Sequence, residues 1–203
     1  MPLFRSKAEA KVREAGYDPA RLPPGQYFTE KWPVLHAGEV PDVDLAAWRL
    51  GVTGEVEEPL SLSYDELKAL PAREVTTDIH CVTRWSRFDA RFKGVHWSEL
   101  AMLARPKPTA HFAIAHAEYG FTANVPLAAL EDEQALIVYE ADGEPLTPDH
   151  GWPVRLLIPS KYFWKSAKWL TEIELSSIDK PGFWERYGYH NDADYWQEQR
   201  YSF

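Results

Sequence analysis

The strongest constraint on the fold is a series of short strand-like segments separated by few and short helical ones. Helical patterns occur at about 7–15, 63–70 and 98–104, and capping-box spacing marks the first two. The strand-like segments are 48–56, 73–82, 110–117, 134–140, 154–159 and 168–175. This succession predicts an α+β fold whose core is a mixed, barrel-like arrangement of β-sheet.

The chain reads as one domain over residues 1–203, because it shows no repeat and no break in composition. Residues 17–44 carry five of the sixteen prolines and predict an irregular but ordered arm. The arm contains Tyr27, Phe28 and Trp32, and we expect these rings to fix it to the domain and to line a site. The aromatic segment 179–203 is expected to wrap back over the domain.

The charge balance excludes several classes of function. A formal net charge of -9 makes general nucleic-acid binding unfavourable, since the chain repels phosphate backbones. No apolar run reaches the ~18 residues of a membrane span. The first residues show neither the apolar region nor the paired arginines of an export signal. The sequence therefore predicts a cytoplasmic protein without a membrane span.

The only cysteine, Cys81, has three open interpretations. A lone cysteine is often a small buried hydrophobe. Arg84 and Arg87 follow closely, however, and nearby cations favour the thiolate, which reacts as a nucleophile or binds metal. A zinc site that also uses His80 is disfavoured, because neighbouring strand residues point to opposite faces. Alternation over 73–82 places on one face Val75, Thr77, Ile79 and Cys81.

A second feature is the segment 150–170, which contains no acidic residue in an otherwise acidic chain. One interpretation is an exposed basic face. The cations alternate with large aromatic residues, however, which favours a pocket for an anion. No glycine-rich phosphate loop is present. A thiolate together with an anion site suits a cofactor that carries a soft metal at one end and a phosphate at the other. The cations are Arg155, Lys161, Lys165 and Lys168.

Three motifs together resemble one family. They are HCVTRWS with the following KGV, then GEPLTPDHGWPVRLLIPSKYFWKSAKW, then GFWERYGYH. From about residue 26 onward the chain resembles the sulfite-oxidase-like molybdopterin oxidoreductases, above all their small single-domain bacterial and archaeal members. The resemblance implies the sulfite-oxidase molybdopterin-binding fold and a molybdenum–molybdopterin cofactor.

The same resemblance implies roles for individual residues. Cys81 would be the thiolate ligand of molybdenum and the catalytic residue. Val34 stands where sulfite oxidases carry a substrate-binding arginine, which puts sulfite in doubt as the substrate. The implied cofactor-binding residues are His36 in the arm, His116, His150 and Arg155 of the HGWPVR motif, and Lys165, Ser166 and Lys168 around the terminal phosphate.

The expected activity is a two-electron oxygen-atom transfer on a small-molecule substrate. Because the chain has no haem or iron–sulfur motif, a separate electron-carrier protein is expected as redox partner. Two other hypotheses stay open at this stage. The first is a non-catalytic module that binds an anion or a partner protein on the same fold. The second is a thiol enzyme without a cofactor.

Overall fold

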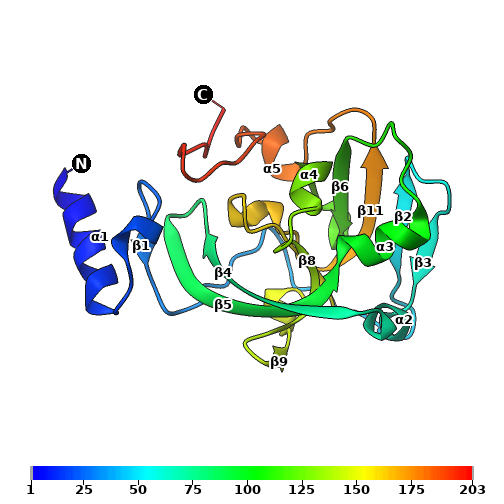
Figure 1. Ribbon diagram of the computed structural model, residues 1–203, viewed down its shortest axis with the longest axis horizontal. Helices are drawn as coiled ribbons and strands as arrows, with labels where there is room; N and C mark the ends of the chain where they lie inside the picture. Colours follow the sequence, from blue (N-terminus) through cyan, green and yellow to red (C-terminus); the bar gives the residue numbers. More distant parts are fainter. Residues whose placement is uncertain (1, 203) are drawn as a thin grey trace.

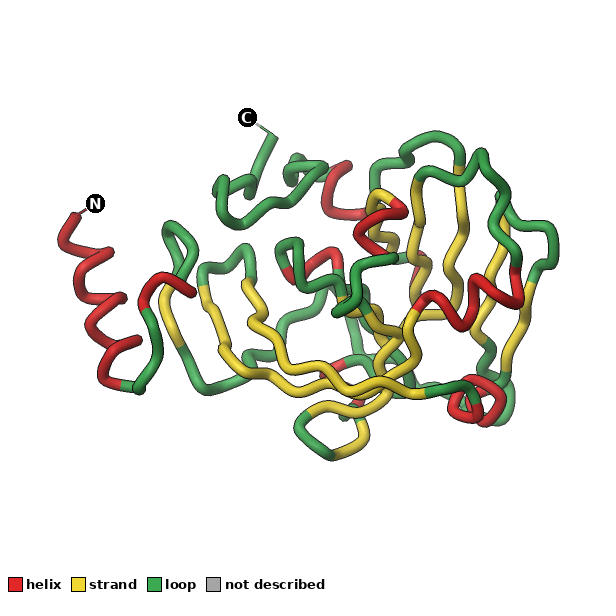
Figure 2. The backbone as a smooth tube through the Cα atoms, viewed as in Figure 1, coloured by secondary structure: helices red, strands yellow, loops and turns green. Residues whose placement is uncertain are grey.

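A computed structural model describes residues 2–202, which form two mixed β-sheets with short helices around them (Figure 1). Figure 2 shows how much of the chain between the strands is loop. The α-helices are α1 (Pro2–Glu14), α2 (Tyr64–Ala69), α3 (Trp97–Ala104), α4 (Leu127–Leu130) and α5 (Phe183–Arg186). The 3₁₀ helices are η1 (Pro19–Arg21), η2 (Glu118–Gly120), η3 (Pro148–His150) and η4 (Phe163–Lys165). The expected α+β class is confirmed.

The first sheet is built around one long strand, β5, which pairs with β4 along one edge and with β1 and β8 along the other. β5 alternates strictly in its middle, where Phe88, Ala90 and Phe92 are buried. This strand is absent from the segments predicted from the sequence. The members are β1 (Tyr27–Phe28), β4 (Ala72–His80), β5 (Trp85–His96), β8 (Leu136–Ala141), β9 (Glu144–Pro145) and β10 (Arg155–Leu157).

The second sheet has the order β3-β2-β11-β6-β7, in which β2 and β11 are parallel and the other neighbours antiparallel. Its strands are β2 (Leu50–Gly54), β3 (Leu60–Leu62), β6 (Phe112–Ala117), β7 (Thr122–Pro126) and β11 (Leu170–Ser176). The main core joins both sheets: Leu50, Ile137 and Ile173 are almost completely buried in it. This core fixes the two sheets relative to each other.

The two N-terminal helix predictions had different outcomes. The capping box of Ser63 and Glu66 is confirmed at the start of α2. The proposed cap at Ser6 is wrong, because α1 begins at Pro2 and places Ser6 inside the helix. The helix still ends before Gly16, whose φ of +84° is the left-handed conformation typical after a helix.

The arm is irregular, as expected, and is fixed to the first sheet. Its residues Tyr27 and Phe28 form β1, which pairs in parallel with the start of β5. Phe28 also packs against Phe88 and Tyr17, with ring centroids 5.2 and 5.4 Å away. The first part of the arm is therefore fixed to this sheet, ahead of its later residues 32–39.

The C-terminal segment wraps back over the first sheet, as the red trace of Figure 1 shows. Tyr162 donates its backbone N–H to Ala193, and Arg200 donates to the carbonyl oxygens of Val82, at 2.6 Å, and Pro24, at 3.4 Å. One buried side chain thus joins the tail to both the arm and the turn after β4. None of the helices formed by residues 2–202 is both long enough and apolar enough to cross a membrane.

Candidate functional site

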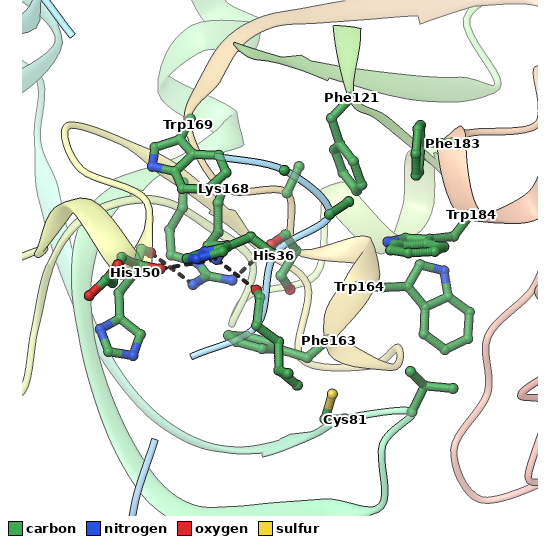
Figure 3. A pocket seen from close by; sticks show the side chains of 18 of the residues that line it. His36, Cys81, Phe121, His150, Phe163, Trp164, Lys168, Trp169, Phe183 and Trp184 are labelled. Carbon is green, nitrogen blue, oxygen red and sulfur yellow. Dashed lines mark hydrogen bonds between the residues drawn. The ribbon is translucent and has the colours of Figure 1, made fainter. Parts of the chain in front are cut away.

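A cavity of about 370 Å³ lies where the arm, the turn after β4, the segment 149–169 and the C-terminal segment meet (Figure 3). Its size is within the range of small-molecule and cofactor sites. Cys81 and Lys168 both line it, so the lone sulfur and the basic segment share one cavity. Of the arm rings expected at a site, Trp32 lines the cavity.

Cys81 lies in a tight turn between β4 and β5. The turn is closed by hydrogen bonds from the Cys81 N–H to the Trp85 carbonyl and from the Arg84 N–H to the Cys81 carbonyl, both 2.9 Å. The pairing of β4 shifts register between Thr77 and Ile79, and β4 ends at His80. Val75, Ile79 and Cys81 still pack in one hydrophobic cluster, as the alternation predicted, although Cys81 lies in the turn and not in the strand. Figure 3 shows the sulfur of Cys81 directed into the cavity.

The surroundings of Cys81 favour the neutral thiol. Burial raises the pKa of Cys81, while the hydroxyl of Thr83, 3.2 Å from Sγ, and the charge of Arg200 lower it by smaller amounts. The predicted influence of Arg87 is not seen, because its guanidinium forms an ion pair with Asp142 at 2.6 Å. A reactive thiol needs a lowered pKa, so this environment argues against a thiol enzyme without a cofactor.

Arg155 is a buried cation without a carboxylate partner among residues 2–202. Its guanidinium donates to the carbonyl oxygens of His150 at 2.9 Å and Ser166 at 2.8 Å, and lies 4.3 Å from the ring centroid of Phe163. Burial lowers its pKa to about 9. The carbonyls hold the group in place but do not neutralise its charge.

Lys168 is a second cation without a carboxylate partner among the described residues, and it is half-buried. Its ammonium donates to the carbonyls of Leu35, at 2.7 Å, and Asp149, at 3.0 Å, and to His36 Nδ1, at 2.9 Å. Burial lowers the pKa of Lys168 to about 7, and the nearby charge of Arg155 adds to the effect. An anion in the cavity would be attracted by both cations, because neither charge is balanced by an ion pair.

A glycine makes the close approach of these cations feasible. Gly151 has a φ of +105°, and a Cβ there would lie 3.0 Å from the Cβ of Lys168 and 3.1 Å from the Cβ of Arg155. A side chain at this position would be strained by the backbone and crowded by both neighbours. The glycine of the HGWPVR motif thus has a packing role at the cavity.

Two histidines line the same end of the cavity. His36 accepts from the Lys168 ammonium at Nδ1, and burial followed by the charge of Lys168 lowers its pKa. His150 donates from Nε2 to the Trp32 carbonyl at 3.3 Å and packs on the Trp32 ring at 4.0 Å; its pKa is lowered mainly by burial. Ser166 also lines the cavity, and its Oγ accepts the Ile158 N–H at 2.9 Å.

Two residues named from the resemblance lie elsewhere. Lys165 is turned away from the cavity and pairs with Glu185 at 2.6 Å, with both side chains buried. His116 on β6 pairs with Glu174 at 2.9 Å. Neither is among the residues that line the cavity. The structure brings together Cys81, His36, His150, Arg155, Ser166 and Lys168.

The other part of the cavity is aromatic, and of its residues only Trp164 lies in the segment predicted to form an anion pocket. Figure 3 shows the rings of Phe121, Trp164, Phe183 and Trp184 on the side away from His150 and Lys168. They come from the residue before β7, from η4 and from the segment GFWERYGYH. The many aromatic residues of that segment are the sequence feature that could have indicated this part of the cavity. The residues are Phe121, Trp164, Phe183, Trp184 and Tyr189.

No group of three or more His, Cys, Asp or Glu side chains within residues 2–202 is placed to hold a metal ion. Any metal near Cys81 would need most of its ligands from a cofactor.

The comparisons with known proteins identify the family. The family described as "Oxidoreductase molybdopterin binding domain" matches residues 37–184. The chain is 48% identical over 183 residues to "Uncharacterized oxidoreductase YuiH" of Bacillus subtilis, covering 90% of this chain and 92% of that protein. It is 29% identical to rat mitochondrial sulfite oxidase over 82% of this chain, but only 37% of the oxidase.

A solved structure shows the same fold. The "Sulfane Dehydrogenase SoxCD" from Paracoccus pantotrophus matches with a TM-score of 0.65 and 21% identity, over 75% of this chain and 43% of the other. The chain thus spans nearly all of the Bacillus protein but less than half of the oxidase and the dehydrogenase. The match over residues 37–184 shows that this chain belongs to the family of oxidoreductases with a molybdopterin-binding domain.

Proposed function

We propose that the protein is a molybdopterin-dependent oxidoreductase that transfers an oxygen atom to or from a small molecule with two electrons. The observation that carries the proposal is the single cavity that Cys81 shares with two uncompensated cations, Arg155 and Lys168. In the balanced reaction, substrate and water give the oxygenated substrate, two protons and two electrons, or the reverse. A separate electron-carrier protein exchanges the electrons.

The residues present fit the cofactor of the family. A soft thiolate suits a molybdenum centre that is otherwise bound by sulfur, and Cys81 presents its sulfur to the cavity. Arg155 and Lys168 offer positive charge for a phosphate, and Ser166 offers a hydroxyl beside them. When bound, the cofactor supplies the two-electron oxygen-atom chemistry.

The protein's own residues would bind the cofactor and orient it in the cavity. Cys81 would occupy one ligand position of the metal after losing its proton, which links metal binding to proton release. Lys168 and Arg155 would hold the anionic end, while His36 and His150 would contact the remaining polar edge. The aromatic residues of the cavity would exclude water from the region near the sulfur; they are Phe121, Trp164, Phe183, Trp184 and Tyr189.

The test measures molybdenum in protein purified from cells that make molybdopterin. The wild type is expected to carry molybdenum, whereas Cys81→Ser should carry close to none. Lys168→Ala should also lose much of it. Lys161→Ala is the matched control, because Lys161 belongs to the same basic segment but pairs with Asp192 at 2.5 Å.

A wild type that folds in such cells without molybdenum would reject the proposal. The binding-module hypothesis predicts that result, together with an unchanged anion affinity in Cys81→Ser. Equal molybdenum in wild type and Cys81→Ser would reject Cys81 as the ligand while leaving cofactor binding intact.

A further inference from the structure

Residues 33–39 of the arm form a strap along one side of the cavity. The strap belongs to no helix or strand, and residues 34–39 are exposed to solvent. All residues of the strap except Val34 also line the cavity. The strap therefore separates this part of the cavity from the solvent.

Both ends of the strap are fixed by packing. Just before it, the Trp32 ring lies 4.0 Å from the His150 ring, and the Trp32 carbonyl accepts a hydrogen bond from His150 Nε2 at 3.3 Å. Just after it, Pro41 is buried and Val43 packs against the main core. Any movement of the strap would therefore be confined to the short span between Trp32 and Pro41.

Between these ends the strap is held mainly by one side chain. Within residues 2–202, the hydrogen bonds that join the strap to the rest of the protein all come from the Lys168 ammonium. They run to the Leu35 carbonyl at 2.7 Å and to His36 Nδ1 at 2.9 Å, and Figure 3 shows His36 beside Lys168. One ring contact adds to them, because His36 lies 5.6 Å from the Trp169 ring.

The Lys168 ammonium has no N–H group left for an anion. An ammonium group has three donors. In this structure the three acceptors are the Leu35 carbonyl, His36 Nδ1 and the Asp149 carbonyl. An anion that accepts a hydrogen bond from Lys168 must replace one of them, and two of the three belong to the strap. A charged phosphate oxygen is a stronger acceptor than a carbonyl oxygen, so it competes well for these donors.

Arg155, the other cation of the cavity, has no such conflict. Its guanidinium donates to the carbonyl oxygens of His150 and Ser166, and neither residue is in the strap. A guanidinium also carries five N–H donors, so it can bind an anion and keep its present contacts. Of the two cations, Lys168 alone links anion binding to the strap.

From these contacts we infer that the strap is a gate at the cationic end of the cavity, and that an anion bound by Lys168 releases it. Without an anion, Lys168 keeps the gate closed. An anion that takes over the ammonium removes one or both hydrogen bonds of the strap and leaves it held at Trp32 and Pro41. The inference deepens the proposed function and rests on it in one respect, since the anion that would act in the cell is the phosphate of the cofactor.

The experiment measures the mobility of the strap by EPR, with a nitroxide spin label on Gly38→Cys. A side chain fits at this position, because nothing lies within 4 Å of an added Cβ. Cys81→Ser is included in every sample, so that the label reacts at one position. Sodium phosphate is added to this cofactor-free protein at about pH 6, where Lys168 is protonated. Sodium chloride at the same ionic strength controls for screening. Equilibrium dialysis of the same samples measures phosphate binding.

The spectrum should follow the occupancy of the anion site. In chloride the label should show restricted mobility, and phosphate should convert most of it into a mobile component as the site fills. In Lys168→Met the label should already be mobile in chloride, and phosphate should add nothing. Lys161→Met is the matched control and should behave like the labelled parent protein, because Lys161 pairs with Asp192 outside the strap.

His36→Ala covers the case in which Lys168→Met does not fold. This variant removes one of the two hydrogen bonds of the strap and leaves the charge of Lys168 in place. The label should then be partly mobile in chloride. Phosphate should release the strap at a concentration about fivefold lower than in the parent protein, since the anion competes with one hydrogen bond fewer.

The outcomes separate the gate from the proposed function. Phosphate that binds without changing the mobility of the label, or that restricts it further, overturns the gate. Absence of phosphate binding at millimolar concentrations also overturns it. A strap released by phosphate in a protein that acquires no molybdenum in cells that make molybdopterin supports the gate and rejects the proposed function. Molybdenum in the wild type together with a strap that phosphate does not release has the opposite meaning.

Discussion

The ammonium of Lys165 lies 2.6 Å from Glu185 Oε1, with both side chains buried, while Lys168 nearby in sequence has no carboxylate partner within residues 2–202. Two lysines of one basic segment therefore have different tasks. Lys165 joins η4 to the C-terminal segment through its ion pair with Glu185. Glu185 also accepts a hydrogen bond from the Trp164 indole, so the pair helps to hold the Trp164 ring in place. Lys168 faces the cavity without such a partner among the described residues.

Substitution at Lys165 should affect stability. Lys165→Met leaves Glu185 buried without its cation, and we expect a loss of about 3–5 kcal/mol in the free energy of unfolding, measured by urea denaturation. The double variant Lys165→Met/Glu185→Leu should recover most of the loss. Lys161→Met, which breaks the more exposed pair with Asp192, should cost about 1 kcal/mol or less. Similar losses in both single variants would contradict the buried pair's role.

Lys168 should make the stability of the cofactor-free protein depend on pH. Its pKa falls from 10.5 to about 7 on folding, mainly by desolvation and then by the charge of Arg155. Between these values the unfolded chain binds more protons, so stability rises with pH over that window and the penalty is fully present below pH 7. The measurement is urea unfolding of wild type and Lys168→Met at about pH 6, 8 and 10. The difference in the free energy of unfolding between wild type and Lys168→Met should shrink or reverse sign toward high pH. A difference that stays constant with pH would contradict the lowered pKa of Lys168.

Gly151 should tolerate alanine poorly. Gly151→Ala adds strain from its positive φ and also crowds the Cβ atoms of Lys168 and Arg155. Gly143→Ala is a matched control, because Gly143 also has a positive φ, of +89°, but nothing lies within 4 Å of the added Cβ. Thermal unfolding should show a larger decrease in melting temperature for Gly151→Ala than for Gly143→Ala. The molybdenum content of Gly151→Ala should also fall. Equal effects would mean that only backbone strain matters at Gly151.

Arg200 should fix the C-terminal segment. Arg200→Leu leaves the Val82 carbonyl without its donor, and we expect a loss of about 1–3 kcal/mol. Hydrogen exchange should speed up both in the tail and in the turn at 81–84. Arg186→Leu is the control, since Arg186 has one long contact, 3.4 Å to the Pro181 carbonyl. Faster exchange in the tail alone would show that Arg200 does not stabilise the turn.

The sequence carried most of the fold signal but not all of it. Alternation and capping predicted the other long strands and α2, because those signals are local. β5 was missed although Phe88, Ala90 and Phe92 alternate with polar residues. Arg87 and Arg91 occupy polar positions of this alternation, so they are part of the strand pattern and not only a source of charge near Cys81.

The sequence indicates which basic residues could form the site, but it does not show which of them pair with acids that are distant in the chain. The basic segment indicated Arg155 and Lys168 as candidates, and both line the cavity. Nothing local indicates that Lys165 and Lys161 are neutralised, because their acids, Glu185 and Asp192, lie in the C-terminal segment. In the same way, the cation that acts on Cys81 is Arg200, which comes close only through folding.

The contact between Arg200 and Val82 joins residues 118 positions apart in the chain. During translation Cys81 is therefore made long before the residues that close its turn from the other side. In a nascent chain that lacks the C-terminal segment, the turn at Cys81 would be without this contact and the sulfur would be exposed to solvent. The cofactor should be inserted only after Arg200 has left the ribosomal tunnel, and ribosome-bound chains stalled before that residue should retain none.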